Sequence, residues 1–171
     1  MAPRSAGSTA SRIRLLVLDV DGVLTDGRLV YGPSGEEIKR FHVRDGLGMQ
    51  AARRAGIEVA VISGRASAAV TRRMSELGIV EVHQGVADKA SLLRGLLGRL
   101  KVRAGEAAVM GDDLTDLPLM EMAGLGLAPA DAVPEVRRAA GWVSRSPGGR
   151  GAVREAVEML LRSRKAWPPR T

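Results

Sequence analysis

The chain has 171 residues and a formal net charge of +7, contains no cysteine, and is only 2% aromatic. This length suits a single domain, whose core must be filled mainly by Leu, Val, Ile, Met and Ala. The lack of cysteine excludes disulfides and thiolate metal sites. No apolar run approaches the roughly 20 residues of a membrane-spanning helix. The basic residues are dispersed and stacking aromatics are scarce, so we expect neither a nucleic-acid nor a membrane partner.

The predicted elements follow one another as short apolar runs separated by segments of helical period. In chain order, the strands are predicted at Arg14–Val20, Glu58–Ile62, Val80–Val82, Ala107–Met110, Leu125–Leu127 and Trp142–Val143. Helices are predicted at Gly46–Ala55, Ser67–Leu77, Lys89–Leu100, Leu114–Met122, Val133–Ala139 and Gly151–Arg162. After the first strand, Arg28–Tyr31 and Glu37–Phe41 flank a turn rich in Gly and Pro and predict a projecting β-hairpin. The order predicts an α/β fold, a Rossmann-like parallel sheet in three layers with helices on both faces.

Both ends of the chain are predicted to lie outside this domain. We place a flexible N-terminal tail at residues 1–12, a single domain at 13–164 and a C-terminal tail at 165–171. The first residues are small, polar and basic without the apolar stretch of a signal peptide, so we expect a cytoplasmic protein. The last segment, KAWPPRT, contains two prolines and cannot continue a helix.

Acidic residues follow two of the predicted strands. The first strand runs into Asp19 and Asp21, and the fourth into Asp112, with Asp113 and Asp116 within the next turn. Carboxyl ends of parallel strands meet at one edge of a sheet, where ligands bind. Carboxylates gathered there repel one another unless their pKa values rise or a divalent cation neutralises them. Oxygen donors without Cys or paired His favour Mg²⁺, with Asp19 and Asp112 as side-chain ligands.

Two further segments suit an anionic ligand at the same edge. Ser63 follows the second strand and precedes Gly64, so its hydroxyl and nearby amides can bind anionic oxygens. Lys89 supplies a compact positive charge that a phosphoryl group and a set of carboxylates both require. On its own Lys89 would be an ordinary solvated lysine, and Asp26 equally suits a cap for the hairpin turn. Together with an aspartate free to act as nucleophile, the set predicts phosphoryl transfer.

The order and spacing of these residues resemble the four motifs of the haloacid dehalogenase superfamily of phosphohydrolases. The matching segments are DVDGVLTD (19–26), Ser63 in VISGR, Lys89, and GDDLTD (111–116). The resemblance implies that Asp19 is the nucleophile and forms an aspartyl-phosphate. It implies that Asp21 protonates the leaving oxygen, later activates water, and lends its backbone carbonyl to the metal.

The resemblance also assigns the remaining motif residues. Asp112 would complete the Mg²⁺ site, supported by Asp113 and Asp116. The groups expected to hold the phosphoryl oxygens are Ser63, Gly64 and Lys89. The intervals before and after Ser63 leave no room for an inserted cap domain, so the hairpin stands in its place.

Within the superfamily the chain resembles the capless, tetrameric 3-deoxy-D-manno-octulosonate 8-phosphate phosphatases. The segments that carry this resemblance include FHVRDGLGM (41–49), HQGVADK (83–89) and GGRGAVREAVEMLL (148–161). It implies hydrolysis of that sugar-acid phosphate in lipopolysaccharide precursor synthesis, by a homotetramer whose hairpins associate. The glycine-rich segment would lie near a neighbour's site, and we expect Arg65 and Asp45 to contact the small anionic sugar-phosphate substrate.

Alternatives from two classes stay open. A sister group acts on 2-keto-3-deoxynononate 9-phosphate, but tends to have Glu where this chain has Arg65, which favours the octulosonate. Other sugar phosphatases of the superfamily are possible in the same way. A catalytically silent oligomeric module would keep the fold, yet it should have lost at least one motif residue, and all of them are present.

Overall fold

The computed structural model describes residues 9–168, and six parallel strands form its main sheet. The strand order is β5-β4-β1-β6-β7-β8, so β1 lies inside the sheet. The strands are β1 (Leu15–Leu18), β4 (Glu58–Ile62), β5 (Glu81–His83), β6 (Ala107–Met110), β7 (Leu125–Ala128) and β8 (Trp142–Val143). All of their pairings are parallel, which confirms the predicted α/β fold.

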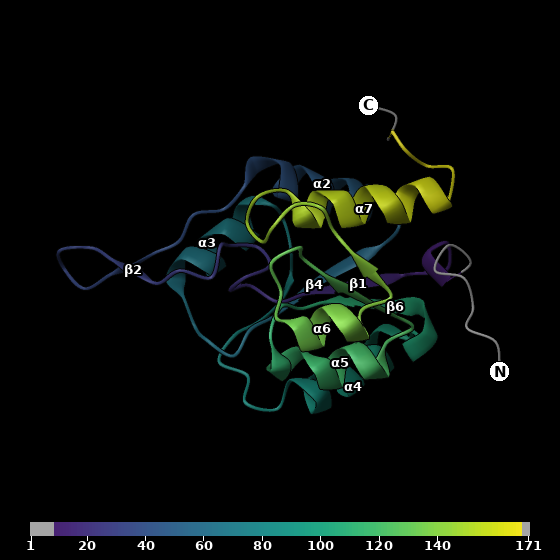
Figure 1. Ribbon diagram of the computed structural model, residues 1–171, viewed down its shortest axis with the longest axis horizontal. Coiled ribbons are helices and arrows are strands. Elements are labelled where there is room, and N and C mark those ends of the chain that lie inside the picture. Colours follow the sequence, from purple (N-terminus) through teal and green to yellow (C-terminus); the bar gives the residue numbers. More distant parts are fainter. Residues whose placement is uncertain (1–8, 169–171) are drawn as a thin grey trace.

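Helices cover both faces of this sheet and give the three predicted layers (Figure 1). One face packs against α2 (Val43–Arg54), α3 (Ala68–Glu76) and α7 (Ala152–Ser163). The other packs against α4 (Lys89–Leu100), α5 (Leu117–Met122) and α6 (Pro134–Ala139). The protein therefore has two hydrophobic cores, one on either side of the sheet.

Strand β1 shows why its sequence is apolar without alternation. Leu16 and Leu18 lie in the core that contains α2 and α7, whereas Leu15 and Val17 lie in the opposite core. All four side chains are buried, as expected for a strand covered on both faces. Hydrogen bonds to β4 on one side and β6 on the other hold the end of β1 in the interior of the sheet.

Several element bounds differ from the predicted ones, and two of the differences have a cause in backbone hydrogen bonding. Strand β1 ends at Leu18 instead of Val20, because the Val20 carbonyl accepts three amides of the following turn. The helix predicted from Leu114 onward is divided into a 3₁₀ turn, Leu114–Asp116, and α5. Pro118 lacks the amide hydrogen that a continuous α-helix would need for the Leu114 carbonyl.

The hairpin forms a separate two-stranded antiparallel sheet, β2 (Val30–Tyr31) with β3 (Glu37–Ile38). It projects from the body of the molecule (Figure 1), as predicted for a hairpin that takes the place of a cap domain. Its exposed apolar side chains are Leu29, Val30, Tyr31 and Ile38.

Parts of both predicted tails pack against the domain. Thr9 and Ala10, which we placed in a flexible tail, are buried, so residues 9–12 belong to the folded unit. At the other end, the Arg154 guanidinium lies 4.7 Å from the ring centroid of Trp167. The rest of the two tail predictions, residues 1–8 and 169–171, falls outside the described residues. Among the described helices, none has the length and apolar character to cross a membrane.

Candidate active site

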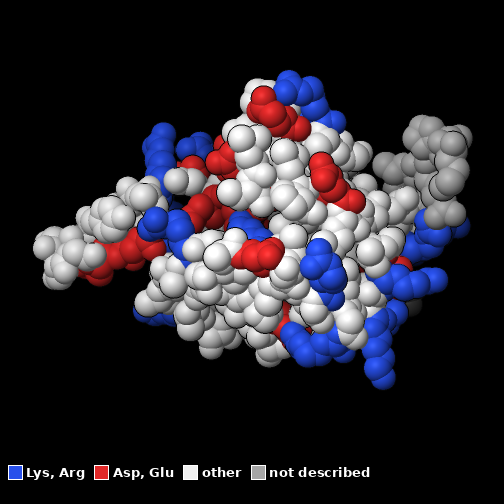
Figure 2. All heavy atoms as spheres, turned by 90° about the horizontal axis from the view of Figure 1, so that it is seen from below, with Lys and Arg blue, Asp and Glu red and all other residues white. Residues whose placement is uncertain are grey.

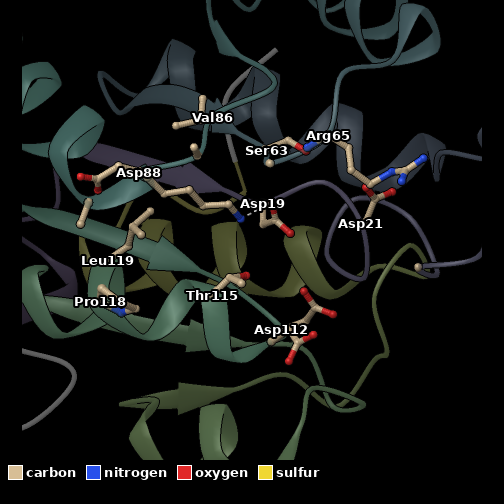
Figure 3. Close-up of a pocket in the computed structure, with 16 residues that line it drawn as sticks. Asp19, Asp21, Ser63, Arg65, Val86, Asp88, Asp112, Thr115, Pro118 and Leu119 are labelled. Carbon is tan, nitrogen blue, oxygen red and sulfur yellow. Dashed lines mark hydrogen bonds and ion pairs between the residues drawn. The ribbon is translucent and has the colours of Figure 1, made fainter.

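The polar residues at the strand ends meet in one cavity of about 570 Å³. Asp19 follows β1, Ser63 follows β4 and Asp112 follows β6, and these strands are neighbours in the sheet. Lys89, at the start of α4, lines the same cavity and is hydrogen-bonded to Asp19, and Figure 3 shows Asp19, Ser63 and Asp112 around this cavity. The sequence motifs, far apart along the chain, are thus brought to one place by strand order.

Both acidic and basic side chains lie on the surface around this region. Figure 2 shows acidic side chains where the hairpin joins the body, with basic side chains beside them. The net charge of +7 comes from 26 Lys and Arg residues against 19 Asp and Glu residues. An excess of positive charge favours the approach of anionic molecules.

Lys89 links two carboxylates at the floor of the cavity. Its Nζ lies 2.9 Å from Asp19 Oδ1 and 2.8 Å from Asp116 Oδ1, and its side chain is 9% exposed. The other oxygen of Asp116 accepts the Asp112 amide at 3.1 Å. Asp116 therefore holds both the lysine and the backbone at Asp112.

Three carboxylates at or just beneath the cavity lie close enough together to hold one metal ion. Asp19, Asp112 and Asp116 each offer an oxygen within 4.8 Å of the other two. Lys89 offsets one of the three negative charges, and a divalent cation would offset the rest. The donor set is entirely oxygen, so these residues fit Mg²⁺. The carboxylate of Asp113 instead accepts the Leu114 amide at 2.7 Å.

Burial and the crowding of negative charge raise the pKa values of Asp19 and Asp112. Burial, aided by the charge of Asp116, raises the pKa of Asp19 to about 6. Burial, aided by the charges of Asp19 and Asp116, raises the pKa of Asp112 to about 7. Lys89 opposes both changes without cancelling them. Binding of a metal ion at this site would therefore release protons from Asp19 and Asp112.

We expect the metal-free protein to lose stability as the pH rises from about 5 to about 8. The folded pKa values of Asp19 and Asp112 are about 6 and about 7, against 3.8 for an ordinary aspartate. The folded state therefore binds more protons than the unfolded state in this window, and the free energy of unfolding falls as protons leave. The melting temperature in EDTA should fall by about 5 °C or more.

Mg²⁺ should counter this loss, and its stabilising effect should be larger at the higher pH, where the carboxylates are ionised. Asp112→Asn should flatten the pH dependence and weaken the response to Mg²⁺. Hydrogen bonds from Arg99 and Arg103 lower the pKa of Glu81 and Glu106 to about 2, so these groups stay ionised throughout. A melting temperature in EDTA that rises over this range would contradict the prediction.

A seam of close backbone contacts supports the loop after β1. Gly22 has φ +83°, and a Cβ there would lie 2.0 Å from Asp112 Oδ2. A Cβ on Gly148 would lie 1.8 Å from the Gly22 carbonyl oxygen, and the Gly149 amide donates to the Val23 carbonyl at 2.9 Å. The glycine-rich segment expected near a neighbour's site therefore packs against the catalytic loop of its own chain.

Asp21 turns away from the three clustered carboxylates and toward the hairpin (Figure 3). Its Oδ1 lies 2.5 Å from Lys39 Nζ, and its Oδ2 lies 3.7 Å from Arg65 Nε. Glu37 Oε1 accepts from Arg65 at 2.9 Å and lies 3.3 Å from Lys39 Nζ. Sequence reasoning missed Lys39 and Glu37, although alternation along an extended hairpin strand places both on one face.

The remaining predicted residues divide into two groups. Ser63, Gly64 and Arg65 line the cavity, and the Ser63 hydroxyl accepts the Arg65 amide at 3.2 Å. Asp45, in contrast, is buried elsewhere, and its carboxylate accepts the Gly151 and Arg154 amides at 3.2 and 2.8 Å. The structure does not bring Asp45 to the cavity, and its carboxylate instead stabilises the N-terminus of α7.

Comparisons with protein families and solved structures agree with the family that the sequence motifs resemble. Residues 71–156 match the family model of haloacid dehalogenase-like hydrolases. The chain is 48% identical over 152 residues to the 3-deoxy-D-manno-octulosonate 8-phosphate phosphatase KdsC of Escherichia coli K12, covering 89% of this chain and 81% of that protein.

Two solved structures are similar over most of the chain. The Moraxella catarrhalis 3-deoxy-D-manno-octulosonate 8-phosphate phosphatase, in complex with a magnesium ion, a phosphate ion and a KDO molecule, superposes with a TM-score of 0.92 at 40% identity. That match covers 94% of this chain and 92% of the other. The cobalt-bound phosphatase of Haemophilus influenzae gives a TM-score of 0.90 at 40% identity, covering 94% and 95%.

Proposed function

Because the chain belongs to the haloacid dehalogenase-like hydrolases, and among them to the 3-deoxy-D-manno-octulosonate 8-phosphate phosphatases, we propose that it releases phosphate from that sugar-acid phosphate. It is a phosphoric monoester hydrolase with Mg²⁺ as its cofactor. The single observation that carries the proposal is the cavity in which Asp19, Lys89 and Asp112 meet. The nononate alternative is not favoured by these relatives, and the silent-module alternative does not explain an intact site.

In the first step a carboxylate oxygen of Asp19 attacks phosphorus, and the bond to the sugar oxygen breaks. Asp21 donates a proton to that leaving oxygen, which departs as the alcohol of 3-deoxy-D-manno-octulosonate. Lys89, Ser63 and the amide of Gly64 hold the phosphoryl oxygens as negative charge develops. When bound, Mg²⁺ supplies charge neutralisation and orientation of the phosphoryl group beside Asp19 and Asp112.

In the second step water hydrolyses the aspartyl-phosphate. Asp21, now ionised, accepts a proton from the water as it attacks phosphorus, and the bond to Asp19 breaks. Inorganic phosphate leaves, Asp19 returns as a carboxylate, and Asp21 is again protonated. The sum is the addition of one water across the phosphate ester, with no other reactant consumed.

The test is a substrate panel assayed with purified protein and Mg²⁺. We expect the highest kcat/KM for 3-deoxy-D-manno-octulosonate 8-phosphate, a lower value for 2-keto-3-deoxynononate 9-phosphate, and low values for hexose phosphates. Release of phosphate from hexose phosphates with none from either keto-deoxy acid would reject the proposed substrate. The proposed setting is the cytoplasm, in the synthesis of lipopolysaccharide precursors.

We also propose that the chain forms a homotetramer through its hairpins. The hairpin presents four apolar side chains to solvent, namely Leu29, Val30, Tyr31 and Ile38, each between 45% and 59% exposed. Exposed apolar surface concentrated on a projecting element is typical of an association surface. A second copy of the chain offers the same surface, and hairpin pairing would bury both.

Light scattering should therefore give a mass of four chains of 18.1 kDa each. Tyr31→Glu should shift the protein to smaller species, because a charge placed in an apolar interface must lose its hydration. Val80→Glu is the matched control, since Val80 is 75% exposed but lies outside the hairpin. A Tyr31→Glu protein that remains tetrameric would count against hairpin-mediated assembly.

A further inference from the structure

We propose that Lys39 is a positioning residue for Asp21, the carboxylate that transfers protons in the proposed mechanism. The inference rests on the proposed function only for the role of Asp21. Its direct basis is the contact between the two side chains, 2.5 Å from Nζ to Oδ1. Lys39 follows β3, so the group that contacts Asp21 comes from the hairpin and not from the main sheet.

The burial of Lys39 sets it apart from an ordinary surface lysine. Its side chain is 2% exposed, and its ammonium lies between the carboxylates of Asp21 and Glu37. A buried ammonium costs several kcal/mol of hydration unless it is paired, and these two anions offset that cost. By contrast, the adjacent Arg40 has a side chain 75% exposed and pairs with Asp26 at 3.2 Å.

The two oxygens of Asp21 are engaged from two directions. Lys39 holds Oδ1, while Arg65 approaches Oδ2 at 3.7 Å from the loop after β4. Glu37 joins the two cations, because its Oε1 contacts both. Asp21 does not belong to the metal-binding group of Asp19, Asp112 and Asp116. Lys39 thus contacts the Asp21 carboxylate at a part of the cavity lining separate from those three carboxylates.

The reaction makes specific demands on such a placement. A group that protonates the leaving oxygen must lie within hydrogen-bond reach of it, and a displacement of about 1 Å can cost about 100-fold in rate. An alkoxide or phenolate needs this proton, whereas p-nitrophenolate is a stable anion and leaves largely without it. Loss of Lys39 should therefore slow the first step selectively for poor leaving groups.

The experiment compares phenyl phosphate with p-nitrophenyl phosphate, neither of which carries the sugar acid. For Lys39→Met we expect kcat/KM to fall about 10- to 100-fold with phenyl phosphate and about threefold or less with p-nitrophenyl phosphate. Because kcat/KM covers events through formation of the aspartyl-phosphate, the ratio isolates the first proton transfer. Lys39→Arg should restore most of the difference, and Arg40→Met should leave both values unchanged.

The possible outcomes distinguish a positioning role of Lys39 from the alternative roles. Equal losses for the two aryl phosphates would overturn the positioning role. A loss confined to the sugar-acid phosphate would instead make Lys39 a substrate contact, which also overturns it. If Lys39→Met does not fold, the Glu37→Gln/Lys39→Met double variant removes both hairpin charges and likewise leaves Asp21 without its contact to Lys39. Wild-type activity on aryl phosphates but not on the sugar phosphate would reject the proposed substrate alone.

Discussion

Asp19→Asn should lower kcat for the sugar-acid phosphate by about 10³-fold or more, because an amide is a poor nucleophile toward phosphorus. The same change replaces one of the three clustered carboxylates by a neutral amide, which keeps one oxygen but loses the negative charge, and so weakens the binding of Mg²⁺. Steady-state phosphate release at saturating Mg²⁺ measures the effect. Retention of more than about a tenth of the wild-type kcat would overturn the assignment of Asp19 as nucleophile.

The stability of Asp19→Asn supplies the control. Burial and the charge of Asp116 oppose ionisation of Asp19, so replacing it with a neutral amide relieves repulsion. In EDTA at about pH 8 its melting temperature should equal or exceed that of the wild type. An inactive protein of undiminished stability would place the loss in the chemistry and not in the fold.

Lys89→Met should reduce both activity and stability. The side chain is buried between Asp19 and Asp116, so its loss leaves two carboxylates without their cation. Breaking a buried ion pair in this way costs about 3–5 kcal/mol of the free energy of unfolding in EDTA. Activity should fall about 100-fold or more, because a preorganised charge no longer faces the phosphoryl oxygens.

Mg²⁺ distinguishes the two effects of Lys89→Met. Since a bound cation also neutralises the carboxylates, Mg²⁺ should recover part of the stability but little of the activity. Denaturant unfolding with and without Mg²⁺, combined with phosphate release, makes the comparison. Arg94→Met, on the exposed side of α4, is the control and should change stability by less than about 0.5 kcal/mol. Full recovery of activity by Mg²⁺ would contradict a direct role for Lys89.

The sequence predicted the main sheet well because its central strands are buried on both faces. The apolar runs of β1, β4 and β6 have no competing interpretation as amphipathic helices, and each ends beside a polar group. Once these strands are parallel and adjacent, Asp19, Ser63 and Asp112 must lie at one edge. The cavity therefore follows from local patterns and one rule of topology.

The features that sequence reasoning missed depend on contacts between distant segments. Nothing near Lys39 indicates that the hairpin bends back far enough to reach Asp21. Asp45 was assigned to the substrate from its motif, but the approach of α7 makes it a partner of backbone amides. Side-chain burial and helix docking decide such cases, and neither is encoded in the spacing of a single segment.

The close approach of Gly148 to Gly22 has a consequence for the order in which the enzyme is completed during synthesis. The carboxylates and Lys89 all precede Gly148 in the chain, so a ribosome delivers every reactive group before this support. Until this segment docks, the loop after β1 has its internal hydrogen bonds to the Val20 carbonyl but lacks the hydrogen bond from the Gly149 amide to the Val23 carbonyl. A nascent chain thus carries its reactive groups before it acquires this support for the loop.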